Sequence, residues 1–349
     1  MAIISVEIGG YSVRAMLKTQ NGTMPIELGN SAGNKVIPSS IAKEINGKIH
    51  VGDEAIIWKY NSEFMSVTEI ENDELTYTKT IYVLSEMLIQ KAHGMTKEEI
   101  IKIIYVVPNY YSKNDPRRSF IKNALNKLGI YNVDFVTVHE AICSRQAYIS
   151  PNQYVMLFDM GHLGLNASVL KRVDSCYETV STKRLELIGG QVFNGIIYRD
   201  IMKKCDPVIP EDIQYHALLN EKLENISIYI KEHLSSNEKY ECPIPCSDKI
   251  YSITRKEFEN ELSSVIGGGF NACQNMVSEN NINSEDIVEA IICGGSCRIP
   301  MIWDRCKIMF KQINPSIRIT NCSNMDNSVF LACEGSFIGN NNSSVTLSF

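Results

Sequence analysis

Residues 155–171 read VMLFDMGHLGLNASVLK, an apolar run that ends in an acid, passes two glycines and resumes as a second alternating apolar run. This order predicts a β-hairpin with a tight glycine turn. Residues 3–17, IISVEIGGYSVRAML, repeat the same order near the start of the chain. A pattern that recurs at such a distance indicates an internal duplication at the scale of a domain.

The two hairpins share a chemistry that suits phosphate. Glu7 and Asp159 end the first strands, and Gly9 and Gly161 follow two residues later. Glycine lets backbone N–H groups come close to an anion and form a nest around it. A carboxylate beside that nest would repel phosphate by itself, so we expect Mg²⁺ between them, held by Glu7 and Asp159 through water. Two such hairpins facing each other would hold a nucleotide's phosphates between two domains.

A simpler interpretation is that both acids only lie at solvent-exposed strand ends. The recurrence of the pattern favours the phosphate site, as do two further strand–Gly-Gly turns, at Gly189-Gly190 and Gly294-Gly295. The sequence contains neither G-x-x-x-x-G-K-[ST] nor G-x-G-x-x-G, so a P-loop and a Rossmann site are both excluded as alternatives.

Length and composition narrow the class of protein. A chain of 349 residues predicts about two domains, and a net charge of −6 with no basic stripe argues against nucleic acid as a partner. The N-terminus lacks the cationic region that is typical of a signal peptide, and no apolar run is long enough to span a membrane. Eleven cysteines, an odd number, fit reduced thiols and a cytoplasmic location. Cys242–Cys246 and Cys293–Cys297 have spacings that zinc could use, but without a matching His/Cys cluster we favour plain packing.

Strands alternate with helices along the chain, which predicts an α/β protein. Capping boxes are indicated at Thr96 with Glu99 and at Thr254 with Glu257, and Asp115-Pro116 indicates another helix start. Helices are expected at 74–93, 116–129, 140–148, 191–205, 211–234, 255–279, from 300 onward, and 327–338. Strands are expected at 2–17 as a hairpin, 26–30, 36–42, 48–52, 100–108, 133–138, 155–171 as a hairpin, 177–190, 239–245, 249–254 and 288–293.

These pieces, in this order, resemble the actin/sugar-kinase/heat-shock-chaperone superfamily, and most of all the ATPase domain of the seventy-kilodalton heat-shock chaperones. IICGGSCRIP (291–300) resembles that family's adenosine motif, and it is the most specific match. The resemblance covers about residues 3–339. It implies two lobes with duplicated RNase-H-like cores, the actin-like ATPase fold, with ATP or ADP and Mg²⁺ in the cleft. The first lobe would be 1–150 with a shortened outer subdomain, the second 151–339 with an outer subdomain at about 191–280, and 340–349 a tail.

The resemblance also assigns roles to individual residues. Glu140 takes the place of a glutamate near the Mg²⁺ and the attacking water, which makes Glu140, Asp159 and Glu7 the expected catalytic residues. The residues expected to bind the nucleotide are Gly9, Gly10 and Tyr11 in the first phosphate loop, Gly161 in the second, Gly189 and Gly190 beside the ribose and phosphates, Lys231 and Ser235 on the adenosine helix, Gly294, Gly295, Arg298 and Ile299 around the adenosine, and Asp326 near the base.

The departures from the family concern catalysis. Glu7 stands where the family has aspartate, and a misplacement of about 1 Å can cost about 10²-fold in rate. The segment that carries the family's catalytic lysine is shortened, and neither Lys59 nor Lys79 aligns with it. Loss of a positioned transition-state charge costs on the order of 10²–10³ in rate, by analogy with oxyanion donors. His162 and Leu163 replace glycines in the second loop, and His162 could offer phosphate a cation. We therefore expect nucleotide binding with slow or absent hydrolysis, at most a weak Mg-dependent ATPase.

Three functions remain open from the sequence. The first is a chaperone-like nucleotide-binding protein that regulates folding, or a partner chaperone or co-chaperone, through lobe closure. The second is an actin-like protein that associates with itself into filaments, a class whose members can also have a trimmed first lobe. The third, a sugar kinase, is the weakest, because it needs a base in the cleft and Glu140 already has a role.

Overall fold

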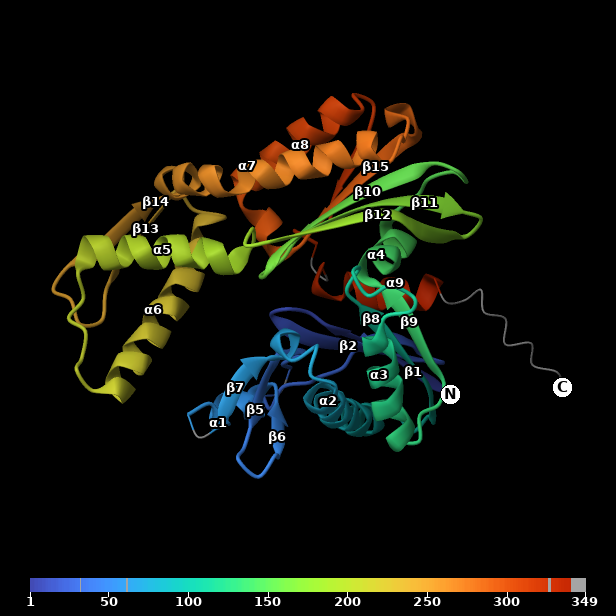
Figure 1. The fold of residues 1–349 in the computed structure, drawn as a ribbon, viewed down its shortest axis with the longest axis horizontal. Coiled ribbons are helices and arrows are strands. Elements are labelled where there is room, and N and C mark those ends of the chain that lie inside the picture. The colour runs from blue at the N-terminus through green and yellow to red at the C-terminus, as the bar shows by residue number, and fades with distance from the viewer. Residues whose placement is uncertain (32, 61, 326–327, 340–349) are drawn as a thin grey trace. The chain divides into compact units, whose positions relative to one another are not determined.

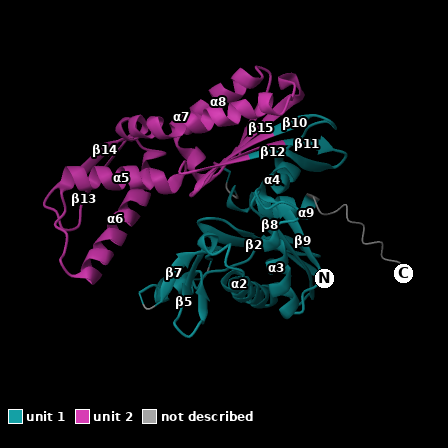
Figure 2. Cartoon of the chain, viewed as in Figure 1, with its two compact units in different colours: residues 1–155, 170–182, 325–349 teal, residues 156–169, 183–324 magenta. Residues whose placement is uncertain are grey.

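The computed structural model describes residues 1–31, 33–60, 62–325 and 328–339 (Figure 1). The chain divides into two compact units, each of which is described by itself (Figure 2). Unit 1 comprises Met1–Val155, Leu170–Thr182 and Met325–Phe349, and unit 2 comprises Met156–Val169 and Lys183–Asn324. The C-terminal helix belongs to unit 1.

The sheet of unit 1 has the strand order β3-β2-β1-β8-β9, with β4 paired to β2. β1 and β2 form the first predicted hairpin, and β8 and β9 run parallel to β1. Its strands are β1 (Ala2–Ile8), β2 (Ser12–Thr19), β3 (Gly22–Pro25), β4 (Val36–Pro38), β8 (Ile100–Val107) and β9 (Val133–Thr137). The helices around it are α2 (Glu74–Met95), α3 (Pro116–Lys127), α4 (Val138–Gln146) and α9 (Leu331–Gly339).

The second large sheet has five strands, in the order β12-β11-β10-β15-β16. When β4 is left out of the first sheet, the strands of both sheets lie in the order third, second, first, fourth, fifth along the chain. The duplication inferred from the two hairpins is therefore confirmed, as is the α/β class. The strands are β10 (Tyr154–Met160), β11 (Gly164–Val173), β12 (Cys176–Glu186), β15 (Ile287–Cys293) and β16 (Arg318–Asn321). The associated helices are α5 (Gly190–Cys205), α6 (Ile213–Leu234), α7 (Arg255–Glu279) and α8 (Pro300–Ile313).

Each unit also carries a small outer sheet. In unit 1, the three strands β6-β5-β7 pack with the short helix α1. In unit 2, β13 pairs with β14 beside α5, α6 and α7. The bounds are β5 (Ser40–Lys43), β6 (Ile49–Val51), α1 (Asp53–Trp58), β7 (Glu63–Ser66), β13 (Lys239–Pro243) and β14 (Ile250–Thr254), with 3-10 turns η1 (Val67–Glu69), η2 (Ser284–Asp286), η3 (Gly295–Arg298) and η4 (Ser328–Phe330).

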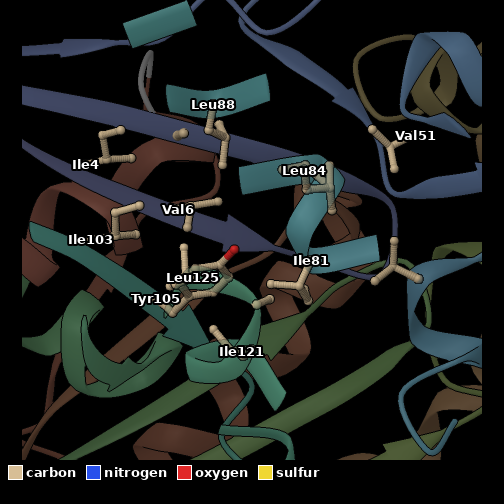
Figure 3. Close-up of a cluster of buried hydrophobic side chains, with 14 of the residues drawn as sticks. Ile4, Val6, Val51, Ile81, Leu84, Leu88, Ile103, Tyr105, Ile121 and Leu125 are labelled. Atoms are coloured by element: carbon tan, nitrogen blue, oxygen red, sulfur yellow. The ribbon is translucent and has the colours of Figure 1, made fainter. Parts of the chain in front are cut away.

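Strand alternation explains the two-sided core of unit 1. Ile103 and Tyr105 of β8 face α2 and α3, where they join the buried cluster in Figure 3. Ile104, between them, packs instead with Phe330 and Phe337 beside α9. Successive residues of a strand point to opposite faces, so a continuous apolar run such as 100–107 is buried on both sides.

The C-terminal helix α9 packs closely on α4 and β1, which is why it belongs to unit 1. A β-carbon added at Gly335 would lie 1.8 Å from the carbonyl oxygen of Ala141, so only glycine permits this approach. The Ser336 hydroxyl lies 2.8 Å from the hydroxyl of Ser5 on β1. Both contacts join residues that are far apart in sequence.

Most predicted helix starts are confirmed. The Asp115 carboxylate accepts from the Arg117 N–H at the start of α3, and Thr254 and Glu257 form a capping box on α7. The capping box at Thr96 is wrong, because the Thr96 hydroxyl accepts from the Glu98 N–H in a turn that leads directly into β8. The strand expected at 26–30 is also wrong, since the strand in this region is β3, which ends before it.

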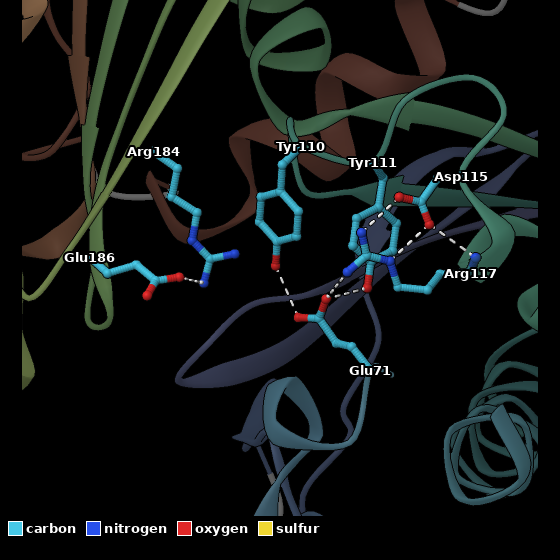
Figure 4. Close-up of polar contacts among 7 residues, drawn as sticks. All are labelled: Glu71, Tyr110, Tyr111, Asp115, Arg117, Arg184 and Glu186. Atoms are coloured by element: carbon cyan, nitrogen blue, oxygen red, sulfur yellow. Dashed lines mark hydrogen bonds and ion pairs between the residues drawn. The ribbon is translucent and has the colours of Figure 1, made fainter. Parts of the chain in front are cut away.

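Unit 1 contains a buried carboxylate held by three donors, which Figure 4 shows. Glu71 accepts from the hydroxyls of Tyr110 (2.9 Å) and Tyr111 (2.8 Å) and from Nη1 of Arg117 (2.7 Å). Arg117 is also paired with Asp115, and this guanidinium holds the pKa of the Asp115 carboxyl below its usual value. The network joins the segment before α2 to the start of α3.

The buried His139 of α4 should lower the free energy of unfolding in acid. Its side chain is 0% exposed, and burial lowers its pKa from 6.5 to about 3. Above pH about 6.5 both states are neutral, whereas below it only the unfolded chain takes the proton, so the free energy of unfolding falls by about 1.4 kcal/mol per pH unit until the folded pKa is reached. Between pH 6.5 and pH 5 the loss is about 2 kcal/mol.

Urea unfolding of wild type and of His139→Gln at pH 7 and pH 5 measures this term. The difference in unfolding free energy between the two pH values should shrink by about 2 kcal/mol in the variant. His93→Gln, a change at an exposed histidine on α2, should leave the wild-type difference in place. An unchanged pH dependence in His139→Gln would contradict the assignment.

Candidate functional site

The two acid–glycine hairpins close in the same way. The Gly9 N–H donates to the Ser12 carbonyl over 2.9 Å, and the Gly161 N–H donates to the Gly164 carbonyl over 3.0 Å. The central residues of the first turn are therefore Gly10 and Tyr11, and those of the second turn are 162 and 163. The Tyr11 ring is 58% exposed, so it lies at the surface of unit 1.

In unit 2, three glycine turns meet at one place. The N–H groups of Gly190 and Gln191, at the start of α5, donate to the carbonyls of Gly161 (3.0 Å) and His162 (2.8 Å). Ser296, from the turn after β15, donates its hydroxyl to the same Gly161 carbonyl over 2.9 Å. The structure thus brings together the hairpin turn, Gly189-Gly190 and the turn of the predicted adenosine motif.

The approach of these turns requires glycine at two positions. A β-carbon added at Gly189 would lie 2.6 Å from the Gly164 nitrogen and 2.7 Å from the His162 carbonyl oxygen. Gly294 has φ +90°, and a β-carbon there would lie 2.4 Å from the Met160 carbonyl oxygen and 2.5 Å from Oδ1 of Asp159. The backbone can approach the end of β10 only because neither residue has a side chain.

Lys231 of α6 lies beside this cluster. A β-carbon added at Gly190 would lie 3.2 Å from the Lys231 ammonium and 3.3 Å from the Ser296 hydroxyl. Burial lowers the pKa of Lys231, and the neighbouring Glu232 carboxylate opposes that shift. None of the ion pairs found among the described residues includes Lys231. A half-buried ammonium therefore lies beside the N-terminus of α5, and no carboxylate of the described residues is paired with it.

His162 also lies in the Gly161–Gly164 turn, and its side chain is neutral. Burial, reinforced by the positive charge of Lys231, lowers its pKa to about 4. At neutral pH it supplies no cation to a phosphate, so the idea of a charged loop histidine is not supported by the structure.

The other predicted nucleotide-binding residues of unit 2 have distinct environments. Ser235 lies one turn after Lys231, and its hydroxyl donates to the Lys231 carbonyl over 3.2 Å. Arg298 is exposed and donates from Nε to the Ser323 carbonyl over 2.9 Å, and Gly295 is exposed as well. Ile299 is only 2% exposed, so its side chain packs inside the unit. Asp326 lies outside the described residues.

In the first hairpin, Glu7 is paired with an arginine. Glu7 and Arg14 are direct partners across β1 and β2, and Arg14 Nη2 lies 2.5 Å from Glu7 Oε1. The Glu7 side chain is 8% exposed. A carboxylate that is already neutralised by a guanidinium does not fit the expected role of a metal ligand.

Glu140 has a structural role at the start of α4. One of its carboxylate oxygens accepts from the Thr137 N–H over 3.2 Å and completes a capping box, while the other accepts from the Thr179 hydroxyl over 3.2 Å. Both oxygens are therefore engaged within unit 1. The proposed catalytic role of Glu140 stays a prediction.

The two lysines considered in place of the family's catalytic lysine both lie in unit 1. Lys59 follows α1, where its ammonium packs over Tyr60 and Phe64, and Lys79 is exposed on α2.

The described part of the chain contains no group of three or more His, Cys, Asp or Glu side chains that could hold a metal ion. All eleven cysteines are free thiols, and those at 293 and 297 are buried. No described helix is both long and apolar enough to cross a bilayer.

Sequence reasoning missed three residues of these sites. Arg14 lies on the returning strand of the predicted hairpin, but its pairing with Glu7 depends on the register of the two strands, which alternation alone does not fix. Ser296 stands inside the quoted GGSCRIP motif, but its bond to Gly161 depends on a contact between distant turns. Thr179 gave no signal, since its partner is known only from the folded chain.

Comparison with known proteins places the chain in a family. A family model described as "Hsp70 protein" matches residues 55–329, which is most of the chain. The chain belongs to the Hsp70 family. The match begins after the first hairpin and does not include residues 1–54.

One curated Hsp70-type relative is the chaperone protein HscA of Buchnera aphidicola subsp. Baizongia pistaciae (strain Bp). It is 26% identical over 242 residues, which cover 67% of this chain and 45% of the relative. The chain thus spans less than half of the length of this relative.

Proposed function

We propose that this chain is a nucleotide-binding protein of the Hsp70 type, and that unit 2 binds a phosphate or ribose group of ATP or ADP at the start of α5. The observation that carries the proposal is the Lys231 ammonium, which lies beside Gly190 and the Gly161–Gly164 turn without an ion-pair partner among the described residues. Its burial is unfavourable unless an anion joins it.

Two further features support an anion there. α5 is 16 residues long, and the N-terminus of a helix carries a partial positive charge that favours phosphate. The helix has no side-chain cap, because its N-cap residue is Gly189. The Gly190 and Gln191 N–H groups are already used within the unit, so the helix dipole and the Lys231 ammonium supply the positive potential at this point of unit 2.

We propose that hydrolysis is slow or absent. Both oxygens of Glu140 are engaged, and Glu7 is paired with Arg14. Lys59 follows α1 and packs over Tyr60 and Phe64, and Lys79 is exposed on α2. The residues that the resemblance assigns to catalysis are thus mostly used to hold unit 1 together. Nucleotide would then act as a ligand that selects a conformation, and not mainly as a substrate.

A chaperone-like role is the function that this binding would serve. The relative HscA is a chaperone protein, so we propose that the chain regulates protein folding, or a partner chaperone or co-chaperone, according to the bound nucleotide. The family match favours this role over an actin-like filament and over a sugar kinase. Pelleting of the protein on addition of ATP would instead favour the filament.

Isothermal titration of the whole chain with ADP tests the binding site. We expect Lys231→Met to weaken ADP binding by about 10- to 100-fold, because a hydrogen bond to a charged group contributes about 1.5–3 kcal/mol. Lys222→Met removes an exposed lysine from the same helix, and it should bind ADP as wild type does.

Equal ADP affinity in Lys231→Met and wild type would refute this site, and a wild type that binds neither ADP nor ATP would refute the function. Phosphate release from ATP by the same samples tests the catalytic part of the proposal. A turnover equal to that of an ordinary Hsp70 ATPase would contradict it.

A further inference from the structure

The first hairpin carries its own cation. Glu7 and Arg14 are register partners on adjacent antiparallel strands, so their side chains leave the same face of the sheet. Their Oε1 and Nη2 atoms lie 2.5 Å apart, and the two side chains are 8% and 20% exposed. A pair this short and this buried is a fixed part of the hairpin.

The guanidinium also lies against the turn. A β-carbon added at Gly9 would lie 3.0 Å from Arg14 Nη2. Gly9 is the residue whose N–H closes the turn by donating to Ser12. The positive charge is therefore positioned beside the backbone that the sequence predicts as a phosphate nest.

This donor set does not suit a divalent ion at Glu7. A carboxylate that holds Mg²⁺, directly or through water, must offer lone pairs and net negative charge. Here the carboxylate and the guanidinium together are neutral, and a metal at this point would be repelled by the guanidinium.

The second hairpin provides the contrast. Asn166 stands seven residues after Asp159, at the position that corresponds to Arg14, and its amide carries no charge. The two copies of the motif have therefore diverged in charge, with a built-in cation in one of them only.

We infer that Arg14 takes the place of a divalent ion at the first hairpin, so that Glu7 is not a metal ligand and nucleotide binding does not depend on Mg²⁺ there. A phosphate that reaches this turn meets a guanidinium, which can donate two parallel N–H bonds to it. The inference rests on the proposed nucleotide binding for its functional meaning, whereas the statement about Glu7 stands by itself.

The first measurement is ADP binding by wild type in saturating Mg²⁺ and in excess EDTA. We expect the two dissociation constants to agree within about threefold, whereas dependence on a bridging metal would lower affinity in EDTA by more than about tenfold. The second outcome would overturn the inference and leave the proposed function intact. Absence of ADP binding in both buffers would refute the proposed function alone.

The second measurement needs no nucleotide. Titration of the protein with Mn²⁺ alone, followed by the loss of the free-ion paramagnetic resonance signal, compares wild type, Glu7→Gln and Asp159→Asn. We expect Glu7→Gln to match wild type in Mn²⁺ binding, whether or not Asp159→Asn lowers it. Weakening of Mn²⁺ binding by more than about tenfold in Glu7→Gln would show that Glu7 is a metal ligand and overturn the inference.

Variants of Arg14 test whether its guanidinium takes the place of the divalent ion. Arg14→Gln should weaken ADP binding in EDTA by about tenfold or more, and Mg²⁺ should restore part of the loss because Glu7 is then free to attract an ion.

Arg172→Gln is the matched control, since Arg172 donates to the Ile149 and Asp174 carbonyls away from the turn. Circular dichroism establishes that each variant is folded, and Arg14→Lys, which keeps the charge, should retain Mg²⁺-independent binding. Arg14→Gln with wild-type affinity in EDTA would contradict the role of Arg14.

Discussion

Replacement of Gly294 by alanine is expected to destabilise unit 2 by about 2–5 kcal/mol and to abolish nucleotide binding at neutral pH. The left-handed backbone at φ +90° accounts for about 1–2 kcal/mol of this. The remainder, about 1–3 kcal/mol, comes from forcing a methyl group within 2.4 Å of the Met160 carbonyl oxygen and 2.5 Å of Asp159 Oδ1. The strain can relax only by moving the turn away from β10.

The two tryptophans allow this measurement to be made for one unit at a time. Trp303 lies in α8 of unit 2 and Trp58 in α1 of unit 1, so a Trp58→Phe background reports unit 2 through Trp303 fluorescence during denaturant unfolding. Gly268→Ala is the control. Gly268 is a helical glycine of α7 with nothing within 4 Å of an added β-carbon, so alanine there should stabilise by about 0.5–1 kcal/mol. Equal effects of the two substitutions would show that the contact at Gly294 is not restrictive.

Replacement of Arg117 by methionine is expected to destabilise unit 1 by about 3–5 kcal/mol. The change leaves Glu71, whose side chain is 8% exposed, without its guanidinium, and it removes the partner of Asp115 at the start of α3. Two tyrosine hydroxyls remain on Glu71 but carry no positive charge. The Arg117 guanidinium holds the pKa of the Asp115 carboxyl below its usual value, so this part of the stabilisation is present at neutral pH and is lost as the pH falls through that lowered pKa.

Denaturant unfolding in a Trp303→Phe background, followed by Trp58 fluorescence, measures the effect in unit 1. Arg145→Met is the control, since Arg145 pairs with Glu334 at 3.2 Å with its own side chain 43% exposed. An exposed pair of this kind contributes at most about 1 kcal/mol. A loss below 1 kcal/mol in Arg117→Met would mean that the Glu71 network is not a stabilising feature of unit 1.

Much of the fold follows from local patterns in the sequence. Period-two alternation interrupted by glycine predicts both acid–glycine hairpins, and their recurrence predicts the repeated strand order that the two sheets share. Caps such as Asp115 and Thr254 fix helix starts, because the side chain that satisfies the first N–H groups lies within three residues of them. These signals are local, and local signals are visible before the chain folds.

What could not be predicted depends on register and on contacts between distant segments. The pairing of Glu7 with Arg14 follows from the exact partner positions on β1 and β2, and a slip of one residue would have turned Arg14 to the other face. The close approach of Gly335 to Ala141 joins helices that are nearly two hundred residues apart in the chain. The capping box expected at Thr96 shows that a local pattern can also fail. No helix forms after Thr96, because β8 begins at Ile100 and pairs with β1.

The location of α9 has a consequence for synthesis. Because α9 packs on β1 and β2, this part of the N-terminal sheet stays uncovered until residues 331–339 have been synthesised. Ile104 and Met16, which α9 buries, are exposed throughout translation of unit 2. The unit that is made first is therefore completed last, and its nascent apolar face is a natural place for a holding factor to act during biogenesis.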